Sequence, residues 1–184
     1  VKHILKYWAL SEKQDFHVIP TDTISISIDK DAVLRSGIML PDSIRHLKGK
    51  ELKNAIPDKI YISLKDMRIL TKVDMLMLEM LANCNWERPL YLAISVGSIS
   101  KLKFDNYFVQ EGLAFRFTPF DYKKWGNVKG DNNYAIDVER LYENVMNRYK
   151  YGGLDTPGLY LDETTLRTCY YHRRLFAQLA KELI

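Results

Sequence analysis

Residues 59–96 read KIYISLKDMRILTKVDMLMLEMLANCNWERPLYLAISV. Apolar residues alternate with polar ones over 60–64, recur at helical spacing over 73–84, and then run almost without interruption over 90–96. Thr71 with Asp74 three residues later matches an N-terminal capping pair for the helix. Continuous apolarity is typical of a strand covered on both faces. The stretch therefore predicts a central βαβ unit whose strands are parallel and joined by a right-handed crossover.

Further elements are expected on both sides of this unit. Alternating residues over 24–28 predict a strand, followed by a short helix that Asp29 caps and Gly37 ends. Residues 38–58 read as a surface connection with room for one short helix. Segments 107–109 and 114–120 predict strands that extend the sheet. The predicted fold class is α/β, with a mixed sheet of about four to five strands and flanking helices.

The C-terminal part turns helical. An amphipathic pattern over 138–149 ends at Gly152 and Gly153, and a second one begins near Asp162 and runs to the last residue. These patterns predict a C-terminal helical pair. We expect residues 1–184 to form a single soluble domain, with 1–134 mainly the sheet part and 135–184 the helices. Because the last pattern is still helical at Ile184, we also expect the chain to be a fragment of a longer membrane protein.

Composition narrows the function classes. The net charge is +4, from 27 Lys and Arg against 23 Asp and Glu, and these residues are interspersed without a basic tract. Together with the lack of a known nucleic-acid motif, this argues against a nucleic-acid partner. No run is long and apolar enough to span a bilayer. Cys84 and Cys169 lie on apolar helix faces, which favours buried free thiols over a disulfide, although a bridge stays possible.

Motifs with a strong catalytic mechanism are missing. The chain has no Gly-rich phosphate loop, no zinc-protease motif and no nucleophile elbow. The four histidines stand singly, apart from His172 three residues after Cys169, and two ligands do not make a metal site. We therefore expect no catalytic residue, no metal and no cofactor on this chain.

The segment 83–89 is the least generic part of the sequence. As structure, its Asn residues end a helix, Trp86 seals the seam between helix and sheet, and Glu87 and Arg88 make local polar contacts. As function, a Trp beside a carboxylate is a platform for a sugar ring. Structure is the favoured interpretation. The candidate ligand-binding residues are Trp86, Glu87, Arg88, Glu111 and Trp125.

Two other functions stay open. A polar, aromatic loop over 121–134, with Tyr122, Trp125 and Tyr134, suits a stand-alone carbohydrate- or peptide-binding domain. A soluble glycoside hydrolase is less favoured, because it needs Glu87 with Asp105 or Glu111 as two carboxyls about 5 to 10 Å apart.

Several blocks in order resemble a Bacteroidetes family of multi-pass membrane proteins of unknown function, which are themselves similar to protein O-mannosyltransferases. The blocks are 17–21, 28–34, 85–91, 105–108, 111–114, 152–153 and 160–163. The resemblance implies a transmembrane part outside this chain that holds any catalytic carboxylates. It also implies that this domain is the soluble C-terminal region at the periplasmic face of the inner membrane.

From the resemblance we expect a non-catalytic accessory domain of a glycosyltransferase-like membrane protein. Such a domain would position an acceptor or stabilise the membrane part. Its expected partners are its own transmembrane region, a following helical segment, and a glycan or polypeptide acceptor.

Overall fold

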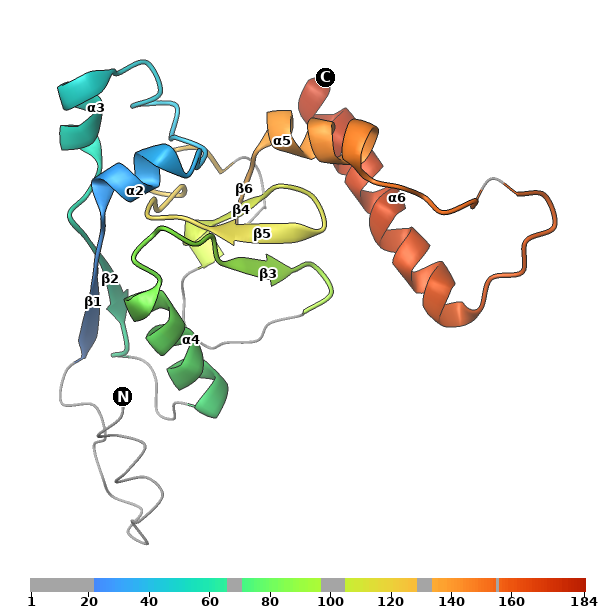
Figure 1. Cartoon of the computed structure of the whole chain (residues 1–184), viewed down its shortest axis with the longest axis horizontal. Coiled ribbons are helices and arrows are strands. Elements are labelled where there is room, and N and C mark those ends of the chain that lie inside the picture. The colour runs from blue at the N-terminus through green and yellow to red at the C-terminus, as the bar shows by residue number, and fades with distance from the viewer. Residues whose placement is uncertain (1–21, 66–70, 97–104, 129–133, 155) are drawn as a thin grey trace, which may run out of the picture. The chain divides into compact units, whose positions relative to one another are not determined.

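The computed structural model describes residues 22–65, 71–96, 105–128, 134–154 and 156–184, drawn as the coloured ribbon in Figure 1. The chain divides into two compact units. Unit 1 takes its described residues from 22–38, 43–65 and 71–90, and unit 2 takes all the others. Compact units can still unfold as one cooperative domain, so the single domain expected from the sequence stays a prediction.

Two antiparallel strands form the sheet of unit 1. Strand β1 (Thr23–Ser27) pairs with β2 (Lys59–Ser63), so that Ile26 lies opposite Ile60 and Ile24 opposite Ile62. Because side chains alternate along a strand, the isoleucines share one face and the polar residues share the other. Ile26 and Ile60 are buried, whereas Tyr61 on the other face is exposed. The alternation predicted for both segments is confirmed.

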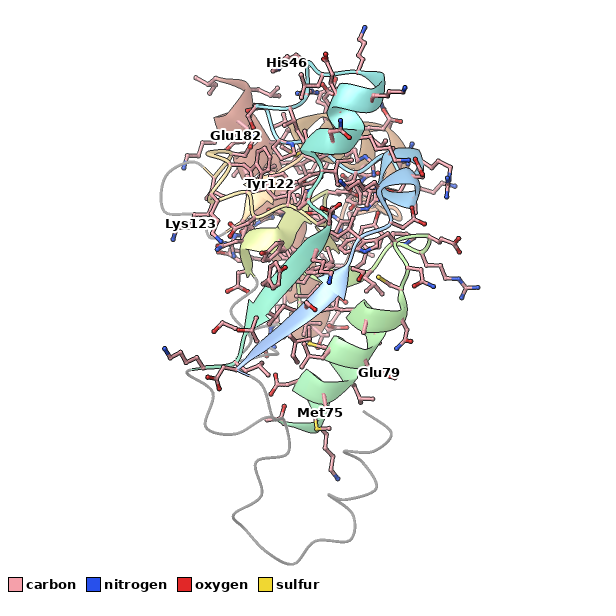
Figure 2. The ribbon with its side chains drawn as sticks, turned by 90° about the vertical axis from the view of Figure 1, so that its left-hand side faces the viewer. His46, Met75, Glu79, Tyr122, Lys123 and Glu182 are labelled. Carbon is pink, nitrogen blue, oxygen red and sulfur yellow. The ribbon has the colours of Figure 1, made fainter. Side chains whose placement is uncertain are left out.

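Three helices complete the described part of unit 1. Helix α2 (Lys30–Arg35) is capped by Asp29 as predicted, and α3 (Gly49–Ala55) is the short helix expected within 38–58. Helix α4 (Lys72–Asn83) lies beside β1 in Figure 1 and, seen with its side chains, in Figure 2, where Met75 and Glu79 are labelled. Its N-terminus carries the full capping box between Thr71 and Asp74. Its buried residues are Asp74, Met75, Leu78 and Leu81.

A four-stranded mixed sheet forms the centre of unit 2. Its strands are β3 (Tyr91–Ala93), β4 (Phe108–Gln110), β5 (Ala114–Phe117) and β6 (Ala135–Ile136), in the order β3-β5-β4-β6. Only β4 and β6 are parallel; the other pairs are antiparallel. A single 3-10 turn, η1 (Asp105–Tyr107), leads into β4. The α/β class and the mixed sheet are therefore confirmed.

The central βαβ unit is wrong in its pairing. Its first strand, β2, pairs with β1, and its second, β3, pairs with β5 in the other sheet, so the two are not a parallel pair. The continuous apolarity over 90–96 also predicted a strand covered on both faces, which is wrong. The strand covers only three of those residues, at one edge of the sheet, and Tyr91 is 49% exposed. Local pattern set the elements, whereas the choice of partner strand depends on long-range packing.

The predicted C-terminal helical pair is present in unit 2. Helix α5 (Val138–Glu143) continues directly into a π-helical segment, η2 (Asn144–Arg148), and α6 (Glu163–Leu183) packs against α5. Their contact surface is a fully apolar cluster of Leu141, Val145, Leu175 and Leu179. Among the described residues, no helix has both the length and the apolar character that a membrane span requires.

Candidate functional site

Unit 2 holds a pocket of about 540 Å³ where the edge of its sheet meets α5 and η2. That size is within the range of small-molecule sites, roughly 300–1,000 Å³. Strands β3 and β5 supply one side of the lining, and the helical segments supply the other. The lining residues are Tyr91, Glu111, Ala114, Arg140, Glu143, Asn144, Arg148 and Tyr149.

Glu111 organises this pocket from a buried position. Its Oε1 accepts from Arg140 Nη1 at 3.0 Å and from Arg116 Nη1 at 3.5 Å, while its Oε2 accepts from Tyr91 Oη at 2.8 Å. The Glu111 side chain is only 7% exposed. A buried carboxylate requires such donors, because an unpaired charge away from water is costly. The cluster therefore fixes the Tyr91 ring and the Arg140 guanidinium in place.

The turn that carries Glu111 is held against η2. Gly112 has a φ of +147°, and a Cβ at this position would overlap the hydroxyl oxygen of Tyr149. That hydroxyl accepts from the Leu113 amide at 2.9 Å, and Asn144 Nδ2 donates to the Glu111 carbonyl at 2.6 Å. Only glycine lets the two segments approach this closely. The backbone of the turn is thus tied to the helical side of the pocket.

The π-helical segment shapes the helical side. The Tyr149 amide donates to the Asn144 carbonyl at 2.8 Å, an i to i+5 bond that widens the turn. In an α-helix of 3.6 residues per turn, side chains four residues apart are displaced slightly around the helix axis. A π-turn has more residues per turn, so it displaces them in the opposite sense and brings them back into line. Arg140, Asn144 and Arg148 consequently all line the pocket. Single π-turns within helices are frequent at functional sites.

Burial acts on two ionisable groups of the cluster. It raises the pKa of the Tyr91 phenol, and the hydrogen bond to Glu111 raises it further, so Tyr91 stays a neutral donor. Burial also raises the pKa of Asp137, which caps α5 by accepting from the Arg140 amide at 3.0 Å. Tyr91 donates to the Glu111 carboxylate, and Asp137 accepts from the Arg140 amide, so both groups help to hold Glu111 and Arg140 in position.

The structure places three of the sequence candidates in unit 1. Trp86 is 5% exposed and its indole donates to the Ser27 carbonyl at 2.9 Å, which ties the end of α4 to β1. Its φ of +62° and that of Asn85, +48°, form the left-handed turn that ends the helix. These contacts favour the structural interpretation of Trp86. Glu87 and Arg88 are exposed, and their ligand binding stays a prediction.

The other two candidates lie in unit 2 and have different neighbours. Glu111 is in the pocket, whereas Trp125 is half-buried with its ring edge-on to Phe120, centroids 6.2 Å apart. The three aromatic residues named for this loop pack against other residues of unit 2. Tyr122 is fully buried and its hydroxyl donates to the Met39 carbonyl, and Tyr134 packs edge-on against Phe115. Figure 2 shows Tyr122 among other side chains while the neighbouring Lys123 projects outward.

The hydrolase candidates divide between the two units, Glu87 in unit 1 and Asp105 and Glu111 in unit 2, so the pairing of Glu87 with Asp105 or Glu111 stays a prediction. Asp105 is exposed and Glu111 is buried, with both oxygens of Glu111 already accepting from Arg and Tyr donors. Donors on both oxygens favour a structural role for this carboxylate over an acid/base role. Cys84 and Cys169 are free, and the described residues contain no group of three or more His, Cys, Asp or Glu placed to hold a metal ion.

Sequence reasoning named one member of this pocket and missed the others. Glu111 was named as a ligand-binding candidate, but Tyr91, Arg140 and Asn144 were not. Tyr91 and Glu111 both fall inside blocks on which the family resemblance rests. Their presence in these blocks is the sequence signal that could have pointed to both residues. Arg140 and Asn144 carry no comparable signal, because nothing local marks the π-turn that positions them.

Comparison with known proteins supplies one match. The family model described as TMEM260-associated domain 2 matches residues 2–139, which is 138 of the 184 residues and includes Tyr91 and Glu111. Neither the curated proteins nor the solved structures provide a match. TMEM260 is an O-mannosyltransferase-like protein, which agrees with the resemblance seen in the sequence. The chain belongs to the TMEM260-associated domain 2 family.

Proposed function

We propose that this chain is a non-catalytic accessory domain of a membrane-embedded glycosyltransferase-like protein, facing the periplasm, where it positions an acceptor or stabilises the membrane part. The match to the TMEM260-associated domain over residues 2–139 carries this proposal. The chemistry of the pocket in unit 2 supports it. Glu111 is engaged by Tyr91 and two arginines, an arrangement suited to holding a ligand next to a rigid sheet edge.

The test is removal of residues 22–184 from the full-length membrane protein, followed by two measurements. One is the amount of membrane protein that remains, and the other is glycan transfer to acceptor, followed by mass spectrometry. A positioning domain predicts a normal protein level with transfer reduced through a higher KM for acceptor. A stabilising domain predicts a lower protein level. Normal protein level together with unchanged transfer contradicts both roles.

The periplasmic location is tested by labelling with a membrane-impermeant maleimide. The variant Lys50→Cys places a thiol on exposed α3, in a background with Cys84→Ser and Cys169→Ser. The proposal predicts labelling in intact cells, and the same background without the Lys50 change is the control. Labelling that requires lysis of the inner membrane places this domain on the other side.

A further inference from the structure

We propose that the pocket of unit 2 binds one pyranose ring of an uncharged glycan, with Tyr91 as its stacking surface. The inference rests on the proposed accessory function for its biological role, since it names the class of acceptor or product that the domain would hold. The class of ligand is inferred from the geometry of the pocket. Three features of the described residues support it.

The first feature is an aromatic ring that is both exposed and fixed. Tyr91 is 49% exposed at the edge strand β3, yet its hydroxyl donates to the buried Glu111. An unanchored surface tyrosine loses rotamer freedom when a ligand orders it, and that loss weakens binding. Tyr91 has already lost this freedom in the folded chain. Its ring therefore offers an apolar surface for the C–H face of a sugar at small entropic cost.

The second feature is a rim of donors and acceptors that can exchange partners. Glu143 Oε1 lies 3.5 Å from Arg148 Nε, and these side chains are 46% and 68% exposed. An ion pair this exposed contributes little to stability. Arg148 and Glu143 Oε1 can therefore turn to a ligand, while Glu143 Oε2 accepts from Asn147 Nδ2. Carboxylate accepts, guanidinium donates, and a sugar hydroxyl does both. Asn144, anchored through its Nδ2 to the Glu111 carbonyl, also belongs to the lining.

The third feature is the balance of charge. Among the lining residues the charged side chains are Arg140 and Arg148 against Glu111 and Glu143, two of each sign. A site for phosphate or carboxylate shows an excess of donors with positive charge. A site for a cation shows the opposite excess. The equal numbers favour an uncharged ligand whose polar groups are hydroxyls.

The experiment measures binding of defined glycosides to the 184-residue chain by NMR. The uncharged probes are methyl α-mannopyranoside and methyl β-glucopyranoside, and the charged controls are glucuronate and inorganic phosphate. We expect saturable shifts of the Asn144 side-chain amide with an uncharged probe, with a Kd on the order of 1 mM. The charged controls should bind more weakly.

Matched variants assign the binding to the pocket. Tyr91→Ala should weaken the Kd about tenfold or more, whereas Tyr61→Ala, which removes an exposed tyrosine from a strand of unit 1, should leave it unchanged. Tyr91→Phe keeps the ring but removes the hydroxyl that anchors it to Glu111, so its affinity should lie between that of the unchanged chain and that of Tyr91→Ala. Glu143→Gln tests the rim without disturbing a buried group, and dispersed amide spectra establish that each variant is folded.

Three results would overturn the inference. One is the absence of saturable shifts with either uncharged glycoside. Another is tighter binding of phosphate or glucuronate than of the glycosides. The last is unchanged affinity in folded Tyr91→Ala and Glu143→Gln.

The inference and the proposed function fail separately. If the chain binds no glycoside but its deletion still lowers transfer, the accessory role stands and the sugar site does not. If Tyr91→Ala removes binding while transfer by the full-length protein is unchanged, the sugar site stands without a role in positioning.

Discussion

Gly112 sits in the turn between β4 and β5, where two separate constraints act on one residue. Its φ of +147° is in the range that side-chain-bearing residues rarely adopt, and the Tyr149 hydroxyl occupies the space of a Cβ. The turn also carries Glu111, whose carbonyl binds Asn144. A change at Gly112 is therefore transmitted to the pocket through backbone position.

Gly112→Ala should lower the free energy of unfolding by roughly 2–4 kcal/mol, as the sum of backbone strain and overpacking. Urea denaturation measures this value. Gly126→Ala is the matched control, because Gly126 also has a positive φ, +77°, but nothing within 4 Å of its Cβ position. Adding Tyr149→Phe to Gly112→Ala should recover part of the loss by removing the overlapping oxygen. Equal losses in Gly112→Ala and Gly126→Ala would show that no overlap exists.

The same residues show how far a sequence predicts a site. Glu111 was identifiable as a carboxylate at the end of a predicted strand, but its meaning comes from partners 20 and 29 residues away in sequence, Tyr91 and Arg140. A single sequence does not specify such pairings, since they depend on which strand lies at the edge of the sheet. For Trp86, the helix end that it follows is marked by local signals, whereas its hydrogen-bond partner, the Ser27 carbonyl, lies 59 residues away in sequence.

At the scale of elements, helix α4 depends on its N-terminal cap. The Asp74 amide donates to Thr71 Oγ1 at 3.2 Å, and Asp74 Oδ2 accepts from the Thr71 amide at 2.8 Å. Thr71→Ala should cost about 0.5–2 kcal/mol, measured by urea denaturation, because it leaves helix N–H groups without an acceptor. Thr71→Ser keeps the hydroxyl and should be close to neutral. Thr168→Ala is the control, because it removes an exposed threonine inside α6 whose hydroxyl donates to the Thr164 carbonyl but caps no helix.

A cost for Thr71→Ala no larger than that of Thr168→Ala would contradict a role for the cap. The cap is also an element feature that sequence predicted fully, as were β1, β2 and the helices α4 and α6. Each of these depends on residues within one or two turns. The parallel pairing of β2 with β3 failed because β1 offers the same isoleucine alternation to β2, and pattern alone does not rank the two partners.

At the scale of the whole molecule, the two compact units differ in their buried tyrosines. Tyr122 is fully buried in unit 2, and burial strongly raises the pKa of its phenol above the ordinary value of 10.0. Burial also raises the pKa values of Tyr91 and Tyr107 in the same unit. Both side chains are partly exposed, so they contribute less to the pH dependence of stability than Tyr122 does. In unit 1 the described residues include one tyrosine, Tyr61, and it is exposed.

These differences predict that unit 2 loses stability first at alkaline pH. An acid with a higher pKa in the folded chain keeps its proton after the unfolded chain has released it, so stability falls as pH rises above 10. For fully buried Tyr122 the slope is about 1.4 kcal/mol per pH unit. Tyr122→Phe should reduce this slope, although it also lowers stability at neutral pH by removing the hydrogen bond to Met39.

Tryptophan fluorescence can follow each unit by itself, because Trp86 belongs to unit 1 and Trp125 to unit 2. With Trp8 replaced by Phe throughout, Trp125→Phe leaves a probe in unit 1 and Trp86→Phe leaves one in unit 2. Urea transitions are compared at neutral pH and above pH 10. Independent units predict that only the Trp125 transition moves to lower urea. Coincident transitions at every pH would instead establish the single cooperative domain expected from the sequence, because separate units with unequal tyrosine burial cannot respond identically.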